Sequence, residues 1–169
     1  AFIVLSGLSS ATYIINDIFD IKNDQLHPFK KFRPLANKDV PINLAIFIAT
    51  ILAIGSLYVG LKYVTLTFFI ITLIYLLLQF LYSFFLKAIA VADILAIAAG
   101  YILRVYAGEF ASGFHISVWL LLTAISLSLF LAVGKRKSEL TLVSQVKDVN
   151  IANIRKSLSH YSERLLDVY

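Results

Sequence analysis

The sequence contains no cysteine and no methionine among its 169 residues. The absence of cysteine excludes disulfide bonds and thiolate metal sites. Because the first residue is Ala1 and no Met occurs, we expect the sequence to be part of a longer chain. Proline occurs three times. Two of these residues, Pro28 and Pro34, lie close together and prevent a helix from continuing through this stretch.

Charge is also missing from long stretches of the chain, namely residues 1–15, 40–61, 63–86 and 110–134. A membrane-spanning helix needs about 20 mainly apolar residues, so each of the last three runs is long enough. The composition agrees, since 60% of the residues are hydrophobic and the mean hydropathy is +0.85. The sequence therefore predicts an all-α, multi-pass integral membrane helix bundle that forms a single membrane domain over residues 1–169. The predicted spans are residues 1–17, 41–61, 64–86, 89–108 and 116–134.

The positive charges lie beside these spans. Lys and Arg gather between the first two spans, after the third span and after the fifth, whereas the opposite loops hold Lys62 as their one such residue. Basic loops of membrane proteins remain in the cytoplasm, which predicts a cytoplasmic loop with a surface-lying helix over residues 135–164. The net charge of +5 therefore indicates membrane topology and not nucleic-acid binding.

An acidic stretch closes the first apolar segment. Asp17, Asp20 and Asp24 are spaced i, i+3 and i+7, so on a helix they share one face, and Asn16 lies one turn before Asp20. Carboxylates crowded on one face repel one another unless a cation lies between them, and Mg²⁺ binds through one or two carboxylates, water and substrate phosphates. The basic residues that follow, Lys30 and Arg33 among them, are suited to holding those phosphates. The alternative is an ordinary solvated end of a membrane helix.

Two charges lie inside the fourth predicted span. Asp93 and Arg104 are eleven residues apart, about 16 Å along a helix, so they are too far apart to pair and each needs a partner on another helix. Intramembrane charges usually mark a site or a water-filled cavity, although both residues could instead reach the membrane interface. Tyr82 and Lys87 at the end of the third span are either interface anchors or ligands of a diphosphate. The histidines at positions 27, 115 and 160 show no metal-ligand pairing and are predicted to be loop residues.

The motif Asn-Asp-x-x-Asp-x-x-x-Asp beginning at Asn16, followed by His-Pro-x-Lys-x-x-Arg-Pro beginning at His27, resembles the first motif of the UbiA superfamily of intramembrane prenyltransferases. The resemblance implies a UbiA-like helix bundle in which Asp17, Asp20 and Asp24 are catalytic and bind a diphosphate through Mg²⁺. It also places the superfamily's second acidic motif at residues 135–139. There this sequence departs from the pattern, because it has three cations and one Glu.

In this departure, residues 135–139 resemble one branch of the superfamily, the decaprenyl-phosphate phosphoribosyltransferases. This resemblance implies Mg²⁺-dependent transfer of 5-phosphoribose from phosphoribosyl diphosphate to a polyprenyl phosphate, for the synthesis of cell-wall arabinan precursors. It implies a bacterial or archaeal cytoplasmic membrane, with the active site facing the cytoplasm, and leaves a homo-oligomer possible. The substrate-binding residues it implies are Asn16, Lys30, Arg33, Tyr82, Lys87, Asp93, Arg104, Lys135, Arg136 and Glu139.

Two other functions stay open at this point. An aromatic prenyltransferase of the same superfamily would use a prenyl diphosphate and a quinone or haem precursor, and the missing second acidic motif argues against it. A membrane transporter would use the aspartate cluster as a cation pathway, since intramembrane charges also mark transport routes.

Overall fold

The structure is a computed structural model that describes residues 1–27, 29–89 and 91–144. The surface helix predicted as far as residue 164 lies mostly outside these residues, as does any further span after it. The described residues form helices and no strands, which confirms the all-α prediction. The elements are α1 (Phe2–Leu26), η1 (Lys30–Phe32), α2 (Ile42–Tyr63), α3 (Leu66–Phe84), η2 (Leu86–Ala88), α4 (Ala92–Ser112) and α5 (Val118–Ser144).

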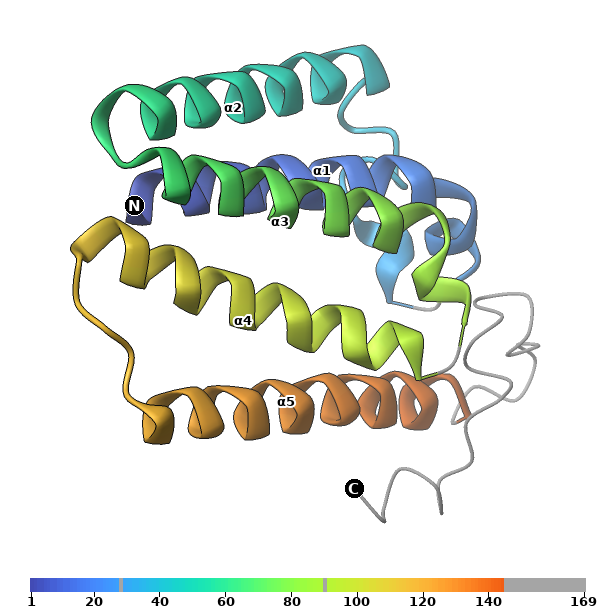
Figure 1. Ribbon diagram of the computed structural model, residues 1–169. Coiled ribbons are helices and arrows are strands. Elements are labelled where there is room, and N and C mark those ends of the chain that lie inside the picture. Colours follow the sequence, from blue (N-terminus) through green and yellow to red (C-terminus); the bar gives the residue numbers. More distant parts are fainter. Residues whose placement is uncertain (28, 90, 145–169) are drawn as a thin grey trace.

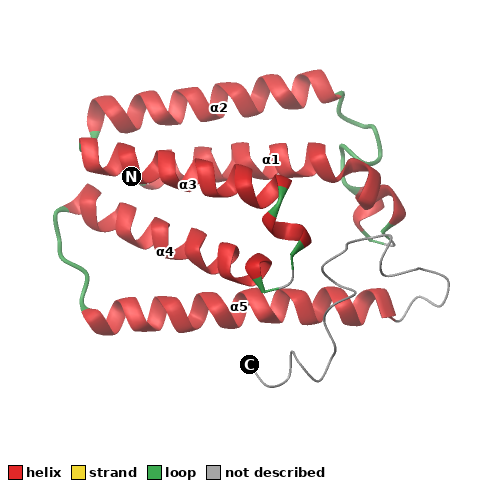
Figure 2. Ribbon diagram, turned by 45° about the vertical axis from the view of Figure 1, so that its right-hand side comes forward, coloured by secondary structure: helices red, strands yellow, loops and turns green. Residues whose placement is uncertain are grey.

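The five long helices of the described ranges lie side by side and run in alternating directions (Figure 1). Helix α2 packs on α1, α3 packs on α1 and α4, and α5 packs on α4, as the second view also shows (Figure 2). All five are long and apolar enough to cross a membrane. Most of their large apolar side chains are exposed, which is stable only in a lipid environment. The chain is thus a multi-pass membrane protein.

Helix α1 ends at Leu26, nine residues beyond the predicted end at residue 17. Helical backbone hydrogen bonds do not depend on whether a side chain is polar, so the acidic residues simply continue the helix. The helix stops before His27, whose extended backbone (φ −83°, ψ 134°) is the conformation favoured for a residue that precedes proline. All three aspartates therefore stand on α1.

Helix α5 continues to Ser144, so the break predicted after residue 134 is absent. Gly134 is tolerated inside the helix, and the residues that follow it are held by buried ion pairs described below. Residues 135–144 therefore belong to α5 and do not begin a loop.

The packed core lies among α1, α3 and α4, in the half of the bundle away from the acidic motif, and includes Leu8, Phe68, Tyr75 and Ala107. At the contact of α1 with α2, Gly7 allows close approach, because a Cβ at this position would lie 2.2 Å from the Oγ of Ser56. Small residues at such contacts are typical of helices that pack in membranes.

Candidate functional site

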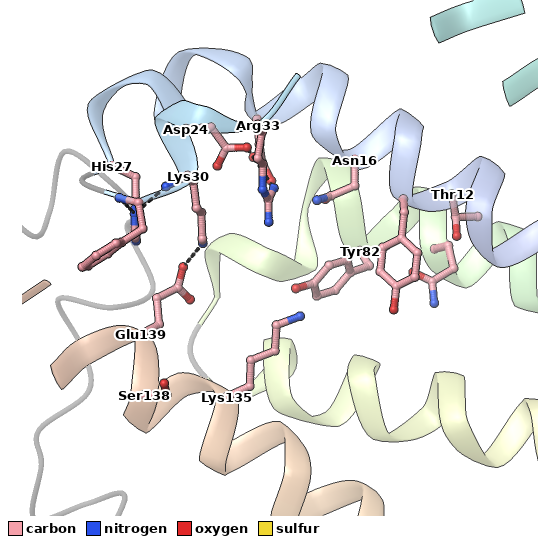
Figure 3. A pocket seen from close by; sticks show the side chains of 14 residues that line it. Thr12, Asn16, Asp24, His27, Lys30, Arg33, Tyr82, Lys135, Ser138 and Glu139 are labelled. Carbon is pink, nitrogen blue, oxygen red and sulfur yellow. Dashed lines mark hydrogen bonds and ion pairs between the residues drawn. The ribbon is translucent and has the colours of Figure 1, made fainter. Parts of the chain in front are cut away.

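A cavity of about 310 Å³ lies at the end of the bundle where α1, α3 and α5 end (Figure 3). These helices place the acidic motif, the end of the third span and the basic motif of α5 at the same end (Figure 1). The cavity is lined by Thr12, Tyr13, Asn16, Asp20, Asp24, His27, Phe29, Lys30, Arg33, Gln79, Tyr82, Lys135, Ser138 and Glu139.

One wall is a polar ridge of α1. Thr12, Asn16, Asp20 and Asp24 follow one another at four-residue intervals, which places them on one side of the helix. In Figure 3, the side chains of Thr12 and Asn16 project from α1 into the space that faces α5. The ridge therefore presents hydroxyl, amide and carboxylate oxygens to the cavity in sequence from its inner end to its mouth.

At the mouth of the cavity, the guanidinium of Arg33 bridges two carboxylates. Its Nη1 donates to Asp17 Oδ1 at 2.7 Å and to Asp24 Oδ2 at 2.9 Å. Arg33 and Asp24 line the cavity, whereas Asp17 is absent from the lining. The structure thus places Asp17 behind Arg33, where it orients the guanidinium.

Lys87 approaches the acidic ridge from η2. Its Nζ donates to Asp20 Oδ1 at 2.6 Å, and both side chains are mostly buried. Lys87 does not line the cavity, so its position supports Asp20 from the outside.

Helix α5 supplies the opposite wall through Lys135, Ser138 and Glu139. Glu139 forms an ion pair with Lys30, and this contact joins α5 to the segment that follows α1 (Figure 3). Lys135 points from α5 toward Tyr82 in the same view. One cation, Lys135, and one carboxylate, Glu139, therefore face the acidic ridge of α1 from α5.

Arg136 points away from the cavity although its neighbour Lys135 lines it. Its side chain is fully buried, with its Nε 2.5 Å from Asp93 Oδ2. It also pairs with Glu139 and donates from Nη2 to Tyr82 Oη at 3.2 Å. The structure therefore places Arg136 and Asp93 between α4 and α5, out of reach of a molecule in the cavity.

Arg104 lies deeper in the bundle. It does not contact Asp93, as the eleven-residue spacing predicts, and donates instead to Tyr75 Oη on α3 at 2.7 Å and to Ser9 Oγ on α1 at 3.2 Å. The expectation that each of these two charges finds a partner on another helix is confirmed.

Sequence reasoning missed several lining residues. Thr12 and Gln79 were detectable, because each is a polar residue one helical turn from Asn16 or Tyr82 within an apolar run. Tyr13, Phe29 and Ser138 carry no comparable signal.

His27 lies in the loop after α1, as predicted, and its side chain is buried in the cavity wall. Its Nδ1 accepts hydrogen bonds from the backbone N–H groups of Phe29 and Lys30, both at 3.2 Å. Burial, reinforced by the positive charge of Lys30, lowers the pKa of the imidazole. His27 is therefore a neutral side chain that shapes the turn after α1.

The oxygens that line the cavity fit a magnesium ion. In the part of the chain that the structure describes, no three carboxylates or imidazoles converge on one point, so the protein alone does not form a closed cage. Mg²⁺ needs only one or two carboxylates when water and phosphate complete its shell. Asp20 and Asp24 would supply these, with the Asn16 amide beside them, and the ion pairs with Lys87 and Arg33 each engage one oxygen of their carboxylate.

The model of the UbiA prenyltransferase family matches residues 1–154. The chain is similar to decaprenyl-phosphate phosphoribosyltransferase of Mycobacterium tuberculosis, with 39% identity over 98% of this chain and 53% of that protein. The enzymes of the same name from Mycolicibacterium smegmatis and Corynebacterium glutamicum are 39% and 37% identical over 98% of this chain, and over 51% and 49% of their own lengths.

The chain thus spans about half the length of the curated relatives it matches. The family match covers every described residue, including the acidic ridge, Arg33, Lys87 and the α5 wall. By this match, the chain belongs to the UbiA prenyltransferase family.

Proposed function

We propose that the protein transfers 5-phosphoribose from phosphoribosyl diphosphate to a polyprenyl phosphate in a Mg²⁺-dependent reaction. The relatives that share 37–39% of its residues carry the name decaprenyl-phosphate phosphoribosyltransferase, which supports this substrate class. By the same similarity, we propose that the product serves the synthesis of cell-wall arabinan precursors.

The observation that carries the proposal is the balance of charge in the cavity. Three carboxylates line it, and so do three cations, Lys30, Arg33 and Lys135. Two acidic motifs would suit one prenyl diphosphate held by metal ions and a second substrate that need not be a phosphate. Here both proposed substrates are anions, and the three cations, Lys30 and Arg33 at the mouth and Lys135 on α5, reduce the repulsion between them.

The donor diphosphate fits at the mouth of the cavity. Lys30 and Arg33 lie there and present N–H donors for phosphate oxygens, and Arg33 can do so as a planar fork. Asp20 and Asp24, with Asn16, would hold Mg²⁺, which when bound offsets the negative charge that develops on the leaving diphosphate.

The bond changes are those of a substitution at the anomeric carbon. A phosphate oxygen of the acceptor forms a bond to C1 of the ribose, while the bond from C1 to the diphosphate oxygen breaks and its electron pair leaves with the diphosphate. A phosphate monoester has its second pKa near 6, so at pH 7 the acceptor is mostly a dianion and needs no general base. The tasks left to the protein are binding, orientation and charge compensation.

The membrane arrangement suits a soluble donor and a lipid acceptor. The exposed apolar sides of the helices give the polyprenyl chain a path between the helices and the surrounding lipid. We propose that the charged end of the bundle faces the cytoplasm, because most of the described lysines and arginines lie at that end.

The test is a transfer assay with the full chain in membranes, using polyprenyl phosphate and radiolabelled phosphoribosyl diphosphate. We expect Mg²⁺-dependent label in the lipid fraction, abolished by EDTA and reduced about a hundredfold or more by Asp20→Asn, since a metal ion contributes several kcal/mol to such a step. The matched control is Asp39→Asn, which changes an exposed aspartate outside the cavity and should leave the rate within twofold.

Three other outcomes would contradict the proposal. Transfer from a prenyl diphosphate to an aromatic acid, without any phosphoribosyl transfer, would instead identify an aromatic prenyltransferase. Undiminished lipid labelling in Asp20→Asn would remove the proposed metal site. Cation flux across proteoliposomes without any transfer would identify a transporter.

A further inference from the structure

A second, smaller cavity of about 90 Å³ lies farther inside the bundle. It shares Thr12, Tyr13, Gln79, Tyr82 and Lys135 with the outer cavity, so the two adjoin. The residues that line the inner cavity alone are Tyr75, Ala96, Ile97, Gly100, Tyr101, Arg104 and Leu131.

Arg104 dominates the chemistry of this inner cavity. It lies twelve residues into α4 from Ala92, about 18 Å along the helix axis. Its guanidinium lies over the rings of Tyr75 and Tyr101, 5.1 and 5.4 Å from their centres. Its hydrogen-bond partners are the hydroxyls of Tyr75, Ser9 and Tyr13, and none of them is a carboxylate. The contacts therefore orient the cation without neutralising it.

The inner cavity is positively charged. Arg33 and Arg136 each pair with two carboxylates, whereas no carboxylate of residues 1–27, 29–89 and 91–144 pairs with Arg104. The Nε of Arg104 is buried and, in the same residues, has no hydrogen-bond partner. Lys135 is a second cation in the cavity wall, and the described lining contains neither Asp nor Glu. Two cations at this depth favour an anionic ligand between them.

We propose that the inner cavity binds a phosphate monoester, at a subsite separate from the diphosphate site at the mouth. The guanidinium of Arg104 matches two phosphate oxygens as a fork, and the ammonium of Lys135 adds a point charge. The side-chain amide of Gln79 lies beside this space and is closely packed, since a Cβ on Gly100 would lie 3.2 Å from its Nε2.

Two ligands carry this group, and their identity rests on the proposed function. Phosphoribosyl diphosphate has a phosphate monoester on its ribose 5-position, and polyprenyl phosphate has one as its head group. Ribose 5-phosphate and farnesyl phosphate each represent one source alone, without a diphosphate. Because neither probe reacts, their binding is measured without any transfer step.

The experiment measures the Kd of each probe for the full chain in lipid nanodiscs. We expect one probe to bind the unsubstituted protein and Arg104→Gln to raise its Kd about tenfold to a hundredfold, the value of a hydrogen bond to a charged group. Arg104→Lys should give a smaller increase, since it keeps the charge but loses the fork. The probe that depends on Arg104 identifies the source of the phosphate.

Two controls separate the inner subsite from general charge effects. Lys62→Gln removes a cation that lies against Tyr58 in the last turn of α2, at the end of the bundle opposite the outer cavity. It should leave the Kd within twofold. Lys31→Gln removes a cation that lines neither cavity and should also leave it within twofold. If Arg104→Gln fails to fold, as its melting temperature would show, Arg104→Lys and Lys135→Gln make the same test.

The proposal is overturned if neither probe binds the unsubstituted protein at millimolar concentration, or if Arg104→Lys and Lys135→Gln both leave the Kd unchanged. The transfer assay is read separately. Arg104-dependent binding in a protein without transferase activity would sink the proposed reaction and keep the subsite. Active transfer with an unchanged Kd in the variants would support the proposed reaction and overturn the subsite.

Discussion

The Nε of Arg136 lies 2.5 Å from the Oδ2 of Asp93, and both side chains are fully buried. This ion pair joins α5 to α4, and Arg136 extends it to Glu139 on its own helix and to the hydroxyl of Tyr82 on α3. Glu139 in turn pairs with Lys30. A continuous chain of charged contacts thus runs from the interior of the bundle to the mouth of the cavity. Arg136 and Asp93 are positioning residues for the side chains that line it.

Asp93→Asn should destabilise the protein by about 3 kcal/mol, because it leaves the fully buried Arg136 with Glu139 as the remaining one of these two carboxylate partners. The measurement is thermal or denaturant unfolding in detergent. Asp93→Leu combined with Arg136→Met should recover much of the loss, since replacing both charges removes the desolvation penalty. The exposed Asp39→Asn is the control for loss of a carboxylate. Equal melting temperatures for Asp93→Asn and the control would show that the pair contributes little.

Lys30 and Lys31 are adjacent but have different surroundings, which makes them a matched pair. Lys30 lines the cavity and pairs with Glu139, whereas Lys31 lies over the ring of Phe32, 5.1 Å from its centre. We expect Lys30→Gln to raise the KM for phosphoribosyl diphosphate about tenfold, the effect of losing one charge-assisted hydrogen bond. Lys31→Gln should change KM less than twofold. Steady-state kinetics at saturating polyprenyl phosphate make the comparison, and equal KM values would remove Lys30 from the donor site.

The membrane spans were predictable because charge is absent from them, and the acidic face was predictable because helical spacing places Asp20 and Asp24 together. The helix ends were not. A change from apolar to charged side chains marks where a helix leaves the lipid, not where its backbone hydrogen bonds stop. Helices α1 and α5 therefore both continue beyond the predicted ends of their spans.

The orientation of individual cationic side chains could also not be predicted from the sequence. Lys135 and Arg136 are neighbours, and consecutive helical residues point about 100° apart, so the two side chains meet different surroundings, and spacing alone does not show which of them lines the cavity. The buried carboxylate of Asp93 decides which, because it holds Arg136 between the helices. That contact joins residues 43 positions apart, and no local pattern reveals it.

The close contact between α1 and α2 gives a stability prediction. In Gly7→Ala the new Cβ meets the Oγ of Ser56, and we expect a cost of about 1 kcal/mol, at the low end for overpacking since a hydroxyl can rotate. Adding Ser56→Ala should restore most of it. Gly55→Ala is the control, because nothing lies within 4 Å of its Cβ position and helical Ala is favoured over Gly. Unfolding in detergent measures all four proteins, and a Gly7→Ala variant as stable as Gly55→Ala would contradict the predicted contact.

His27 gives a prediction of pH dependence. Burial lowers the pKa of its imidazole in the folded protein, with a further contribution from Lys30 and Arg33 and an opposing one from Glu139. As pH falls below the ordinary histidine pKa of about 6.5, the unfolded chain takes up a proton that the folded protein does not. The stability contributed by neutral His27 is therefore complete above that pH and is lost as pH falls toward the lowered pKa of the folded state.

The measurement compares the melting temperatures of the unsubstituted protein and His27→Gln between pH 8 and pH 5. Gln does not titrate in this range, so the variant should lose less stability on acidification, even if it is less stable at pH 8 because the acceptor for the N–H groups of Phe29 and Lys30 has changed. The difference between the two curves isolates His27 from the carboxylates, which are common to both proteins. Parallel curves over the whole range would mean that His27 is protonated as readily in the folded protein as in the unfolded chain. That result would contradict the burial of His27 in the turn after α1.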